Sequence, residues 1–269
     1  MTYKEALTMS NHTALQTFGR SGNPALSDAT FSNEAQNARS QVQDLGLMTL
    51  EGTVNKTGIL LLLVMISASY SWNLFFRSGD ASGVMPLMMV GGIGGFIIAL
   101  VTIFKKHWAG KTAPIYALLE GLFLGGISAI YEAQFQGIVI QAIGLTLGTL
   151  ASLLFLYKTG IVRPTENFRL MVVSATMGIC LLYFVSMVMS MFGSGIGFIH
   201  SNGIIGIGFS LFVVAIAALN LVLDFDFIEL GAEQGAPKYM EWFGAFSLMV
   251  TLIWLYLEML RLLAKLRSR

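Results

Sequence analysis

From residue 58 onward, long apolar stretches follow one another and are separated by short polar breaks. A transmembrane helix needs about 20 predominantly apolar residues, and seven stretches meet that requirement. They cover residues 58–76, 83–104, 112–132, 137–157, 170–199, 204–228 and 237–263. We expect the helix in the fifth stretch to end near the glycines at 193–197. The pattern predicts an all-α integral membrane protein in which residues 58–269 form a seven-transmembrane-helix bundle. The apolar and polar alternation of a membrane β-barrel is absent from the sequence.

The segment before the first apolar stretch has a different character. Residues 1–57 carry nine charged side chains among Ser, Asn, Gln and Thr, and such a segment buries too little apolar surface to fold on its own. We expect a polar, largely flexible tail that stays in water. A short helix between residues 33 and 50 is compatible with the sequence, but the apolar positions are too sparse to indicate a packed domain.

The composition supports a chain that lies mainly in the lipid bilayer. Of 269 residues, 55% are hydrophobic and 12% are charged, whereas roughly a quarter of the residues are charged in soluble domains. The net charge of +1 gives no reason to expect nucleic acid as a partner, because counterion-driven binding needs a concentrated basic surface. Cys180 is the single cysteine, which excludes a disulfide scaffold.

The Lys and Arg residues of the loops indicate the orientation of the chain. If the N-terminus is cytoplasmic, most loop cations fall on the cytoplasmic side: Lys56, Lys105, Lys106, Lys111, Lys158, Arg163, Arg169 and Lys238. Seven crossings put a second group of cations outside, against the rule: Arg261, Lys265, Arg267 and Arg269. Either these charges are tolerated outside or one segment is re-entrant. We favour seven crossings with a cytoplasmic N-terminus.

Glycine is abundant, with 29 residues, and it recurs at four-residue spacing. Gly121 with Gly125 and Gly144 with Gly148 are two such pairs. Small residues at this spacing let helix backbones approach closely. This matters in a membrane, because the apolar lipid removes the hydrophobic driving force for helix association. The glycines therefore predict a compact bundle without identifying its task.

Residues for metal or enzyme chemistry are scarce. His12, His107 and His200 lie in the tail and in two different loops, without the spacing of a zinc site. An intramembrane serine protease needs a buried Ser beside a His, but His200 falls at the end of a predicted helix. No glycine cluster opens a helix after a strand, so a phosphate-binding loop is not indicated. We predict a protein that is not an enzyme and that has no cofactor.

Three carboxylates fall within the otherwise uncharged stretches: Glu120, Asp224 and Glu258. An ionisable group at the centre of a transmembrane helix costs about 2.5 to 3.5 kcal/mol on insertion scales, and such groups are usually functional. Asn220 lies one helical turn before Asp224, so a polar strip enters the bundle on that face. Asp226 is rotated to the other side of its helix and is interpreted as interfacial, with an accessory role at most.

Glu120 and Glu258 also have a structural interpretation. A protonated Glu120 would hydrogen-bond a neighbouring helix, and Glu258 would form an ion pair with Arg261, three residues later. The functional interpretation is a proton or ion site. Desolvation favours the neutral form of a carboxyl group, more so where two carboxyls share a site. Such a pair forms a latch: a hydrogen bond closes it when it is protonated, and ionisation lets it accept a hard cation such as Ca²⁺.

Three stretches resemble motifs of the Bax inhibitor-1 family. LVLDFDFIELGAEQGAPKY, at residues 221–239, is similar to the family's sixth-helix signature, with Asp224 at the position of its Asp and Asp226 at that of its Gln. LLEGLFLGG is similar to the family's TGxxLGP helix, with Glu120 in place of Thr. GNPALSDATF resembles the extended bacterial branch. The resemblance runs from about residue 22 to the end of the chain.

The resemblance implies a pH-sensitive calcium leak in the bacterial inner membrane, gated by aspartates on the sixth and seventh helices. Asp224 corresponds to the first of them. Near Met249, where the family has the second, this chain has no acid, but LYLEML resembles the family's LYLDF and offers Glu258. In a hairpin that turns near Pro237, Glu258 lies about 12 Å farther from the turn than Asp224. The partner of Asp224 is thus left open between Glu258 and Glu120.

We hypothesise a multi-pass protein of the bacterial inner membrane that conducts Ca²⁺ under proton control. Asp224 is the principal gating group and a candidate Ca²⁺ ligand, with Glu258 or Glu120 as its partner and Asn220 and Asp226 as accessory candidates. The alternative is a non-conducting regulator that binds another membrane protein, such as a protease or translocase, through its glycine-lined faces and its tail. A proton-coupled transporter ranks third because the sequence shows no convincing internal repeat.

Overall fold

The computed structural model describes residues 46–193, 197 and 201–268, and long helices dominate this part of the chain. Seven of the described helices are long and apolar enough to cross a membrane, which confirms the predicted seven-helix membrane bundle. They are α4 (Leu50–Ser78), α5 (Met85–Phe104), α6 (Ala109–Gln134), α7 (Ile138–Lys158), α8 (Glu166–Met191), α10 (Ile204–Glu233) and α11 (Met240–Arg267). The short helices η1 (Ala81–Gly83) and η2 (Lys106–Trp108) connect α4 to α5 and α5 to α6.

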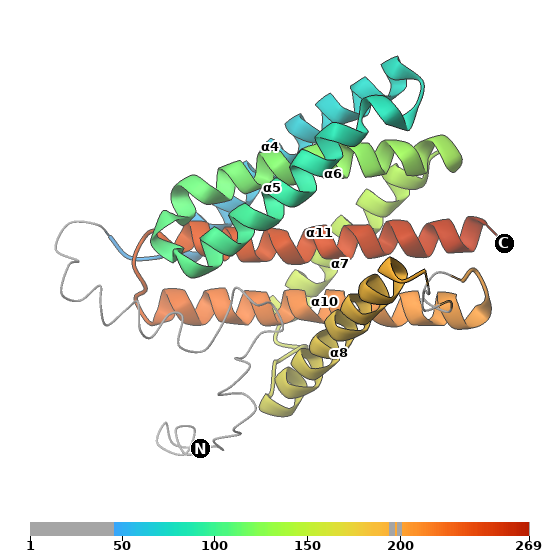
Figure 1. Ribbon diagram of the computed structural model, residues 1–269. Coiled ribbons are helices and arrows are strands. Elements are labelled where there is room, and N and C mark those ends of the chain that lie inside the picture. Colours follow the sequence, from blue (N-terminus) through green and yellow to red (C-terminus); the bar gives the residue numbers. More distant parts are fainter. Residues whose placement is uncertain (1–45, 194–196, 198–200, 269) are drawn as a thin grey trace.

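Consecutive long helices run in opposite directions, so α4 begins and α11 finishes at opposite ends of the bundle (Figure 1). We call these the amino end and the carboxyl end. The most buried helix is α11, which packs against α10, α4, α7 and α6. On the outside, α5 packs on α6 and α8 packs on α10. The buried core therefore surrounds α11, and polar groups on this helix and its neighbours define the candidate site.

The start of α4 differs most from its predicted position. Helix α4 begins at Leu50, eight residues before the apolar stretch, because the Thr49 side chain caps it by accepting a hydrogen bond from the Gly52 amide. The last residues assigned to the polar tail are thus helical. Helix α8 ends at Met191, close to the glycines where its end was expected, and Gly193 follows with a φ of 78°, which a helix cannot continue. The predicted tail up to residue 45 and His200 lie outside the described residues.

The predicted close helix packing is found for one glycine pair but not for the other. Gly121 and Gly125 of α6 face α4 so closely that an added Cβ would collide with the backbone carbonyl oxygens of Val64 and Ala68. In contrast, a Cβ on the second pair, Gly144 and Gly148 of α7, would meet no atom of the other described side chains or helices within 4 Å. The first pair therefore joins two helices, and the second leaves an open face on α7.

Candidate functional site

Asp224 lies in the middle of the bundle, on the face of α10 that packs against α11. Its side chain is fully buried. The carboxylate Oδ2 accepts a hydrogen bond of 2.5 Å from the hydroxyl of Thr251 on α11. Because Asp224 is nine residues before the end of α10 at Glu233, it lies about 13 Å inside the helix. This residue thus satisfies the expectation of an acid deep in the membrane-spanning region.

Asn220 extends the polar strip by one turn, as its spacing predicts. Its Nδ2 donates to the hydroxyl of Thr176 on α8 at 2.8 Å and to the Ile216 carbonyl at 2.9 Å. Its Oδ1 atom is buried and has no hydrogen-bond partner among the described residues. The strip therefore joins α8, α10 and α11 through oxygen-bearing side chains, and it holds one unsatisfied acceptor in its interior.

Asp226, the other acid of this motif, occupies a different environment. It forms an ion pair of 2.7 Å with Arg169 in the first turns of α8, and both side chains are only partly exposed. Nearby on α10, Glu229 accepts a hydrogen bond from the Tyr157 hydroxyl. These contacts belong to the amino end of the bundle, as expected for an interfacial acid, and Asp226 ties α8 to α10 there.

Glu258 lies deeper along α11, toward the carboxyl end. Its side chain is buried, and its Oε1 accepts hydrogen bonds from Arg261 at 2.7 Å and from the Tyr183 hydroxyl at 3.1 Å. The predicted ion pair between Glu258 and Arg261 is therefore present. Glu258 follows Thr251 by seven residues, which is about 10 Å of helix. Since Thr251 is level with Asp224, this separation prevents a direct contact between Asp224 and Glu258.

Glu120 faces yet another part of the bundle. Its polar partner is the hydroxyl of Tyr116, one turn earlier on α6. On its other side it packs against Gly95 of α5, where an added Cβ would lie 2.9 Å from the carboxylate Oε1. The Tyr116 ring packs edge-on against Phe246 of α11 at a centroid distance of 5.0 Å. Glu120 thus belongs to the interface between α5 and α6.

The three predicted acids therefore occupy three separate environments, each with a hydroxyl partner: Thr251 for Asp224, Tyr183 for Glu258 and Tyr116 for Glu120. Where a latch of two neighbouring carboxylates was predicted, the described residues instead pair the Asp224 carboxylate with the Thr251 hydroxyl. The described residues contain no group of three or more His, Cys, Asp or Glu side chains that could hold a metal ion. The role of Asp224 as a Ca²⁺ ligand stays a prediction.

Thr251 was not identified from the sequence as the partner of Asp224, although the sequence contains a pattern that points to it. Ser247 and Thr251 are one turn apart on a strongly apolar helix, and both are buried. Small hydroxyl residues at this spacing mark a polar face inside a membrane bundle. They lie on either side of the position near Met249 where an acid was sought, so the search for a carboxylate passed over them.

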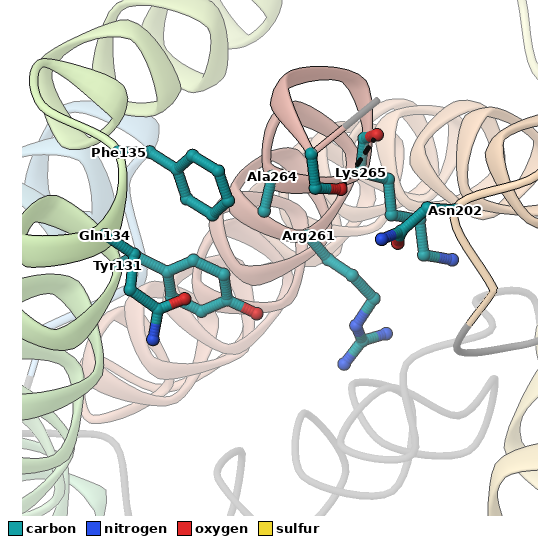
Figure 2. Close-up of a pocket in the computed structure, with 8 residues that line it drawn as sticks. Tyr131, Gln134, Phe135, Asn202, Arg261, Ala264 and Lys265 are labelled. Atoms are coloured by element: carbon teal, nitrogen blue, oxygen red, sulfur yellow. Dashed lines mark hydrogen bonds between the residues drawn. The ribbon is translucent and has the colours of Figure 1, made fainter.

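A pocket opens beside Arg261, near the carboxyl end (Figure 2). Its volume is about 280 Å³, and eight residues line it: Tyr131, Gln134, Phe135, Asn202, Arg261, Ala264, Lys265 and Ser268. The residues come from the end of α6, the segment before α10 and the last turns of α11. None of them was predicted as a site residue.

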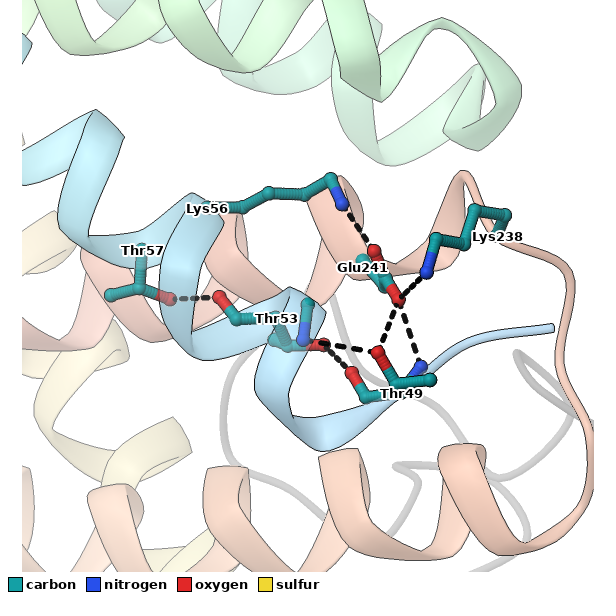
Figure 3. A network of polar contacts seen from close by, with 7 residues as sticks. Thr49, Thr53, Lys56, Thr57, Lys238 and Glu241 are labelled. Atoms are coloured by element: carbon teal, nitrogen blue, oxygen red, sulfur yellow. Dashed lines mark hydrogen bonds and ion pairs between the residues drawn. The ribbon is translucent and has the colours of Figure 1, made fainter. Parts of the chain in front are cut away.

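At the amino end, Glu241 is a further buried acid that was not predicted as a site residue. It is completely buried in the first turn of α11, where it forms ion pairs with Lys56 of α4 and with Lys238 at 2.8 Å (Figure 3). The same carboxylate accepts hydrogen bonds from the amide and the hydroxyl of Thr49, at 2.9 and 2.8 Å. We call these four residues the Glu241 cluster; it fastens the beginning of α4 to the turn between α10 and α11.

Backbone bonds strengthen the same junction. The Met48 amide donates to the Ala236 carbonyl at 2.7 Å, and the Lys238 amide donates to the Gly46 carbonyl at 3.2 Å. Residues 46–49 therefore lie along the α10–α11 turn as a short strap, and they pair with it by an isolated bridge between Leu47 and Pro237. The contacts hold the amino ends of α4 and α11 at a fixed distance.

The arrangement of buried acids in a seven-helix bundle can be compared with known proteins. Residues 23–268 match the family model described as Bax inhibitor 1 like, which is not a known enzyme family. Comparisons with curated proteins and with solved structures gave no significant match. Since the matched segment covers most of the sequence, including every described helix, the chain is a multi-pass membrane protein that belongs to the Bax inhibitor 1 like family.

Proposed function

We propose that this protein is a proton-controlled Ca²⁺ leak of the bacterial inner membrane, with Asp224 as the gating carboxyl. The observation that carries this proposal is the hydrogen bond between the fully buried Asp224 and the Thr251 hydroxyl, which joins two helices in the middle of the bundle. A hydroxyl both donates and accepts hydrogen bonds. Asp224 can therefore exchange its proton without losing this partner.

The two protonation states differ in what they offer to a cation. A protonated Asp224 is neutral, and it holds α10 to α11 by a hydrogen bond. An ionised Asp224 adds a negative charge to a strip that already contains the buried Asn220 Oδ1 and the Thr176 hydroxyl. Carboxylate, amide and hydroxyl oxygens are the ligands that Ca²⁺ prefers. Ionisation thus converts a closed contact into an attractive position for a passing cation.

Glu258 and Glu120 serve as later or parallel positions rather than as the second half of one pair. Glu258 lies about 10 Å along α11 from the level of Asp224, and its Oε2 is buried without a hydrogen-bond partner among the described residues. A cation that leaves the strip near Asp224 toward the carboxyl end meets this oxygen next. Glu120, on the α5 side, can contribute only if α6 rotates, since it faces Gly95.

The orientation follows from the charges at the two ends. The amino end carries the loop cations Lys56, Lys105, Lys106, Lys111, Lys158, Arg163, Arg169 and Lys238. Cytoplasmic loops are enriched in such residues, so we place the amino end in the cytoplasm. The leak then runs past Asp224 first when a cation enters from that side.

Flux through reconstituted protein tests the proposal. Liposomes that contain a Ca²⁺ indicator and the purified protein receive external Ca²⁺ at a series of values from about pH 6 to about pH 8, a range in which buried carboxyls can titrate. We expect a pH-dependent influx in the wild type and a pH-independent influx in Asp224→Asn. Asp226→Asn is the matched control, since it makes the same chemical change two residues away and should keep the pH dependence. Equal influx through wild type and Asp224→Asn at every pH would contradict the gating role.

The alternative function is a non-conducting regulator of another membrane protein. The open face at Gly144 and Gly148 of α7 favours it, since such a face accepts a partner helix. Folded wild-type protein that passes no Ca²⁺ at any pH, but that loses a co-purifying membrane protein after Gly144→Leu, would support the regulator. Unchanged co-purification together with a pH-dependent flux supports the leak.

A further inference from the structure

The pocket at the carboxyl end has the chemistry of an anion site. Two of its eight lining residues, Arg261 and Lys265, are cations, and none of these eight described residues is acidic. Four others have hydrogen-bond donors on their side chains: Tyr131, Gln134, Asn202 and Ser268. Phe135 and Ala264 supply apolar surface beside them (Figure 2). The lining therefore combines positive charge, neutral donors and an apolar wall.

The two cations are held in place before any ligand arrives. Arg261 donates two hydrogen bonds within the described chain, to Glu258 and to Tyr183, and both come from Nη1. Its Nε and Nη2 groups donate to neither of these two residues. The guanidinium carbon Cζ lies 5.2 Å from the Tyr183 ring centroid. Lys265 is buried, and its Nζ donates to the Gly206 carbonyl at 3.0 Å and to the Ser210 hydroxyl at 2.8 Å. A preorganised cation pays less entropy on binding than a mobile one.

The surrounding charges favour an anion as well. Glu258 is already paired with Arg261. Glu132 follows the lining residue Tyr131 on α6, and it accepts hydrogen bonds from the backbone amides of Gly137 and Val139 at the start of α7. Arg267, the last residue of α11, adds a third cation and bonds Gln136 and Gln141. Among the described residues named here, three cations against two acids leave an excess of positive charge around the pocket.

We propose that this pocket binds a phosphate-bearing anion, the headgroup of an acidic phospholipid in the leaflet at the carboxyl end. A guanidinium fork with an ammonium group and neutral donors matches the oxygens of a phosphate group. The pocket lies at the ends of membrane-spanning helices, where headgroups are located, and basic pockets between such helices are a known mode of headgroup binding. Phe135 and Ala264 would then contact the glycerol and the upper part of the acyl chains.

Calorimetry with soluble probes tests both the anion chemistry and its source. Protein in uncharged detergent is titrated with short-chain phosphatidylglycerol, short-chain phosphatidylcholine and inorganic phosphate. We expect phosphatidylglycerol to bind most tightly, with phosphatidylcholine at least roughly tenfold weaker, which is the value of one charge-assisted hydrogen bond. Inorganic phosphate that competes with phosphatidylglycerol supports the phosphate site. If inorganic phosphate binds as tightly as the lipid, the headgroup is overturned as the source and a free anion takes its place.

Two variants locate the site. Ala264→Phe fills the pocket while it keeps every charge, and Glu258→Gln/Arg261→Gln removes both charges of this ion pair together, so that neither is left without the other. Both should weaken phosphatidylglycerol binding by roughly tenfold or more. Lys158→Gln, which removes a cation at the other end of the bundle, is the control and should bind like the wild type. Circular dichroism and gel filtration verify the fold. Wild-type affinity in folded Ala264→Phe, or equal binding of the two lipids, overturns the proposal.

Discussion

Asp224 and Glu258 are two buried carboxylates with different partners. Asp224 accepts a hydrogen bond from a neutral hydroxyl on the neighbouring helix. Glu258 forms an ion pair with Arg261 on its own helix and accepts a second bond from Tyr183 of α8. Protonation leaves the first contact intact, because the hydroxyl can reverse the direction of the bond. Protonation of Glu258 would instead leave the charge of Arg261 unpaired.

These different partners determine which acid can change its charge at a low cost in free energy. An ion pair in a low-dielectric region fixes both charges, since removal of either one leaves the other uncompensated. A carboxyl bonded to a hydroxyl has no such constraint. We therefore expect Glu258 to be mainly a structural anchor near the carboxyl end, and Asp224 to be the group whose state varies. Three substitutions test this contrast, and they are ordered by the expected loss of stability.

The largest effect is expected for Arg261→Met. It leaves the buried Glu258 without its cation, and breaking a fully buried pair costs about 3 to 5 kcal/mol. Because the Arg261 side chain is 35% exposed, water compensates in part, and we expect a loss of about 2 to 3 kcal/mol in the free energy of unfolding. Unfolding by denaturing detergent in mixed micelles measures it. The double variant Glu258→Gln/Arg261→Met should recover most of the loss; no recovery would mean that Arg261 stabilises the protein by packing alone.

An intermediate effect is expected for Thr251→Val, which removes the hydroxyl partner of Asp224 and keeps the shape of the side chain. A buried polar group that loses its partner costs about 1 to 2 kcal/mol, and Asp224 can limit this cost by taking up a proton. Thr251→Ser retains the hydroxyl and is the matched control, which should stay close to the wild type. The same detergent unfolding assay compares the two variants. An equal loss in both would contradict this role of the hydroxyl, because Thr251→Ser retains it and Thr251→Val does not.

The smallest effect is expected for Tyr183→Phe. Glu258 then loses one hydrogen bond but keeps Arg261, and hydrogen bonds between membrane helices contribute about 0.6 kcal/mol on average. We therefore expect a loss of about 0.6 kcal/mol in the same assay. A loss larger than that of Thr251→Val would reverse the contrast, because Tyr183 rather than Arg261 would then be the main partner of Glu258.

The membrane spans were predictable because the bilayer itself imposes their length. Helices of about 20 apolar residues are required whatever their neighbours, so all seven were found, although α4 begins earlier than its apolar stretch. Contacts within one helix were equally accessible. The alignment of Asn220 with Asp224 and the pairing of Glu258 with Arg261 follow from helical periodicity alone.

Contacts between helices were not predictable, since they join residues far apart in the chain. Thr251 is 27 residues from Asp224, and Lys56 is 185 residues from Glu241. The spacing argument left the partner of Asp224 open between Glu258 and Glu120, and it gave no means to choose a hydroxyl in place of an acid. A search for charge pairs alone overlooks neutral partners, which are the common ones in a membrane interior.

The C-terminal cations show the same division. Their number suggested a re-entrant segment, since exposed cations at the outer end of a seventh crossing conflict with the usual charge distribution. In the bundle, Arg261 is paired with Glu258, Lys265 is bonded to Gly206 and Ser210, and Arg267 is bonded to Gln136. These side chains are part of the packed structure rather than of a free loop. Seven crossings are therefore compatible with them.

The number of spans, the position of each acid along its helix and the family could be read from local apolar patterns and short motifs. The partner of each acid, the burial of Glu241 and the pocket between Arg261 and Lys265 became known from the packing of the helices. In lipid, apolar surface is in a favourable environment everywhere, so helix association depends on close packing and on a few polar contacts. Which residues make those contacts is set by the rotation and depth of each helix relative to its neighbours.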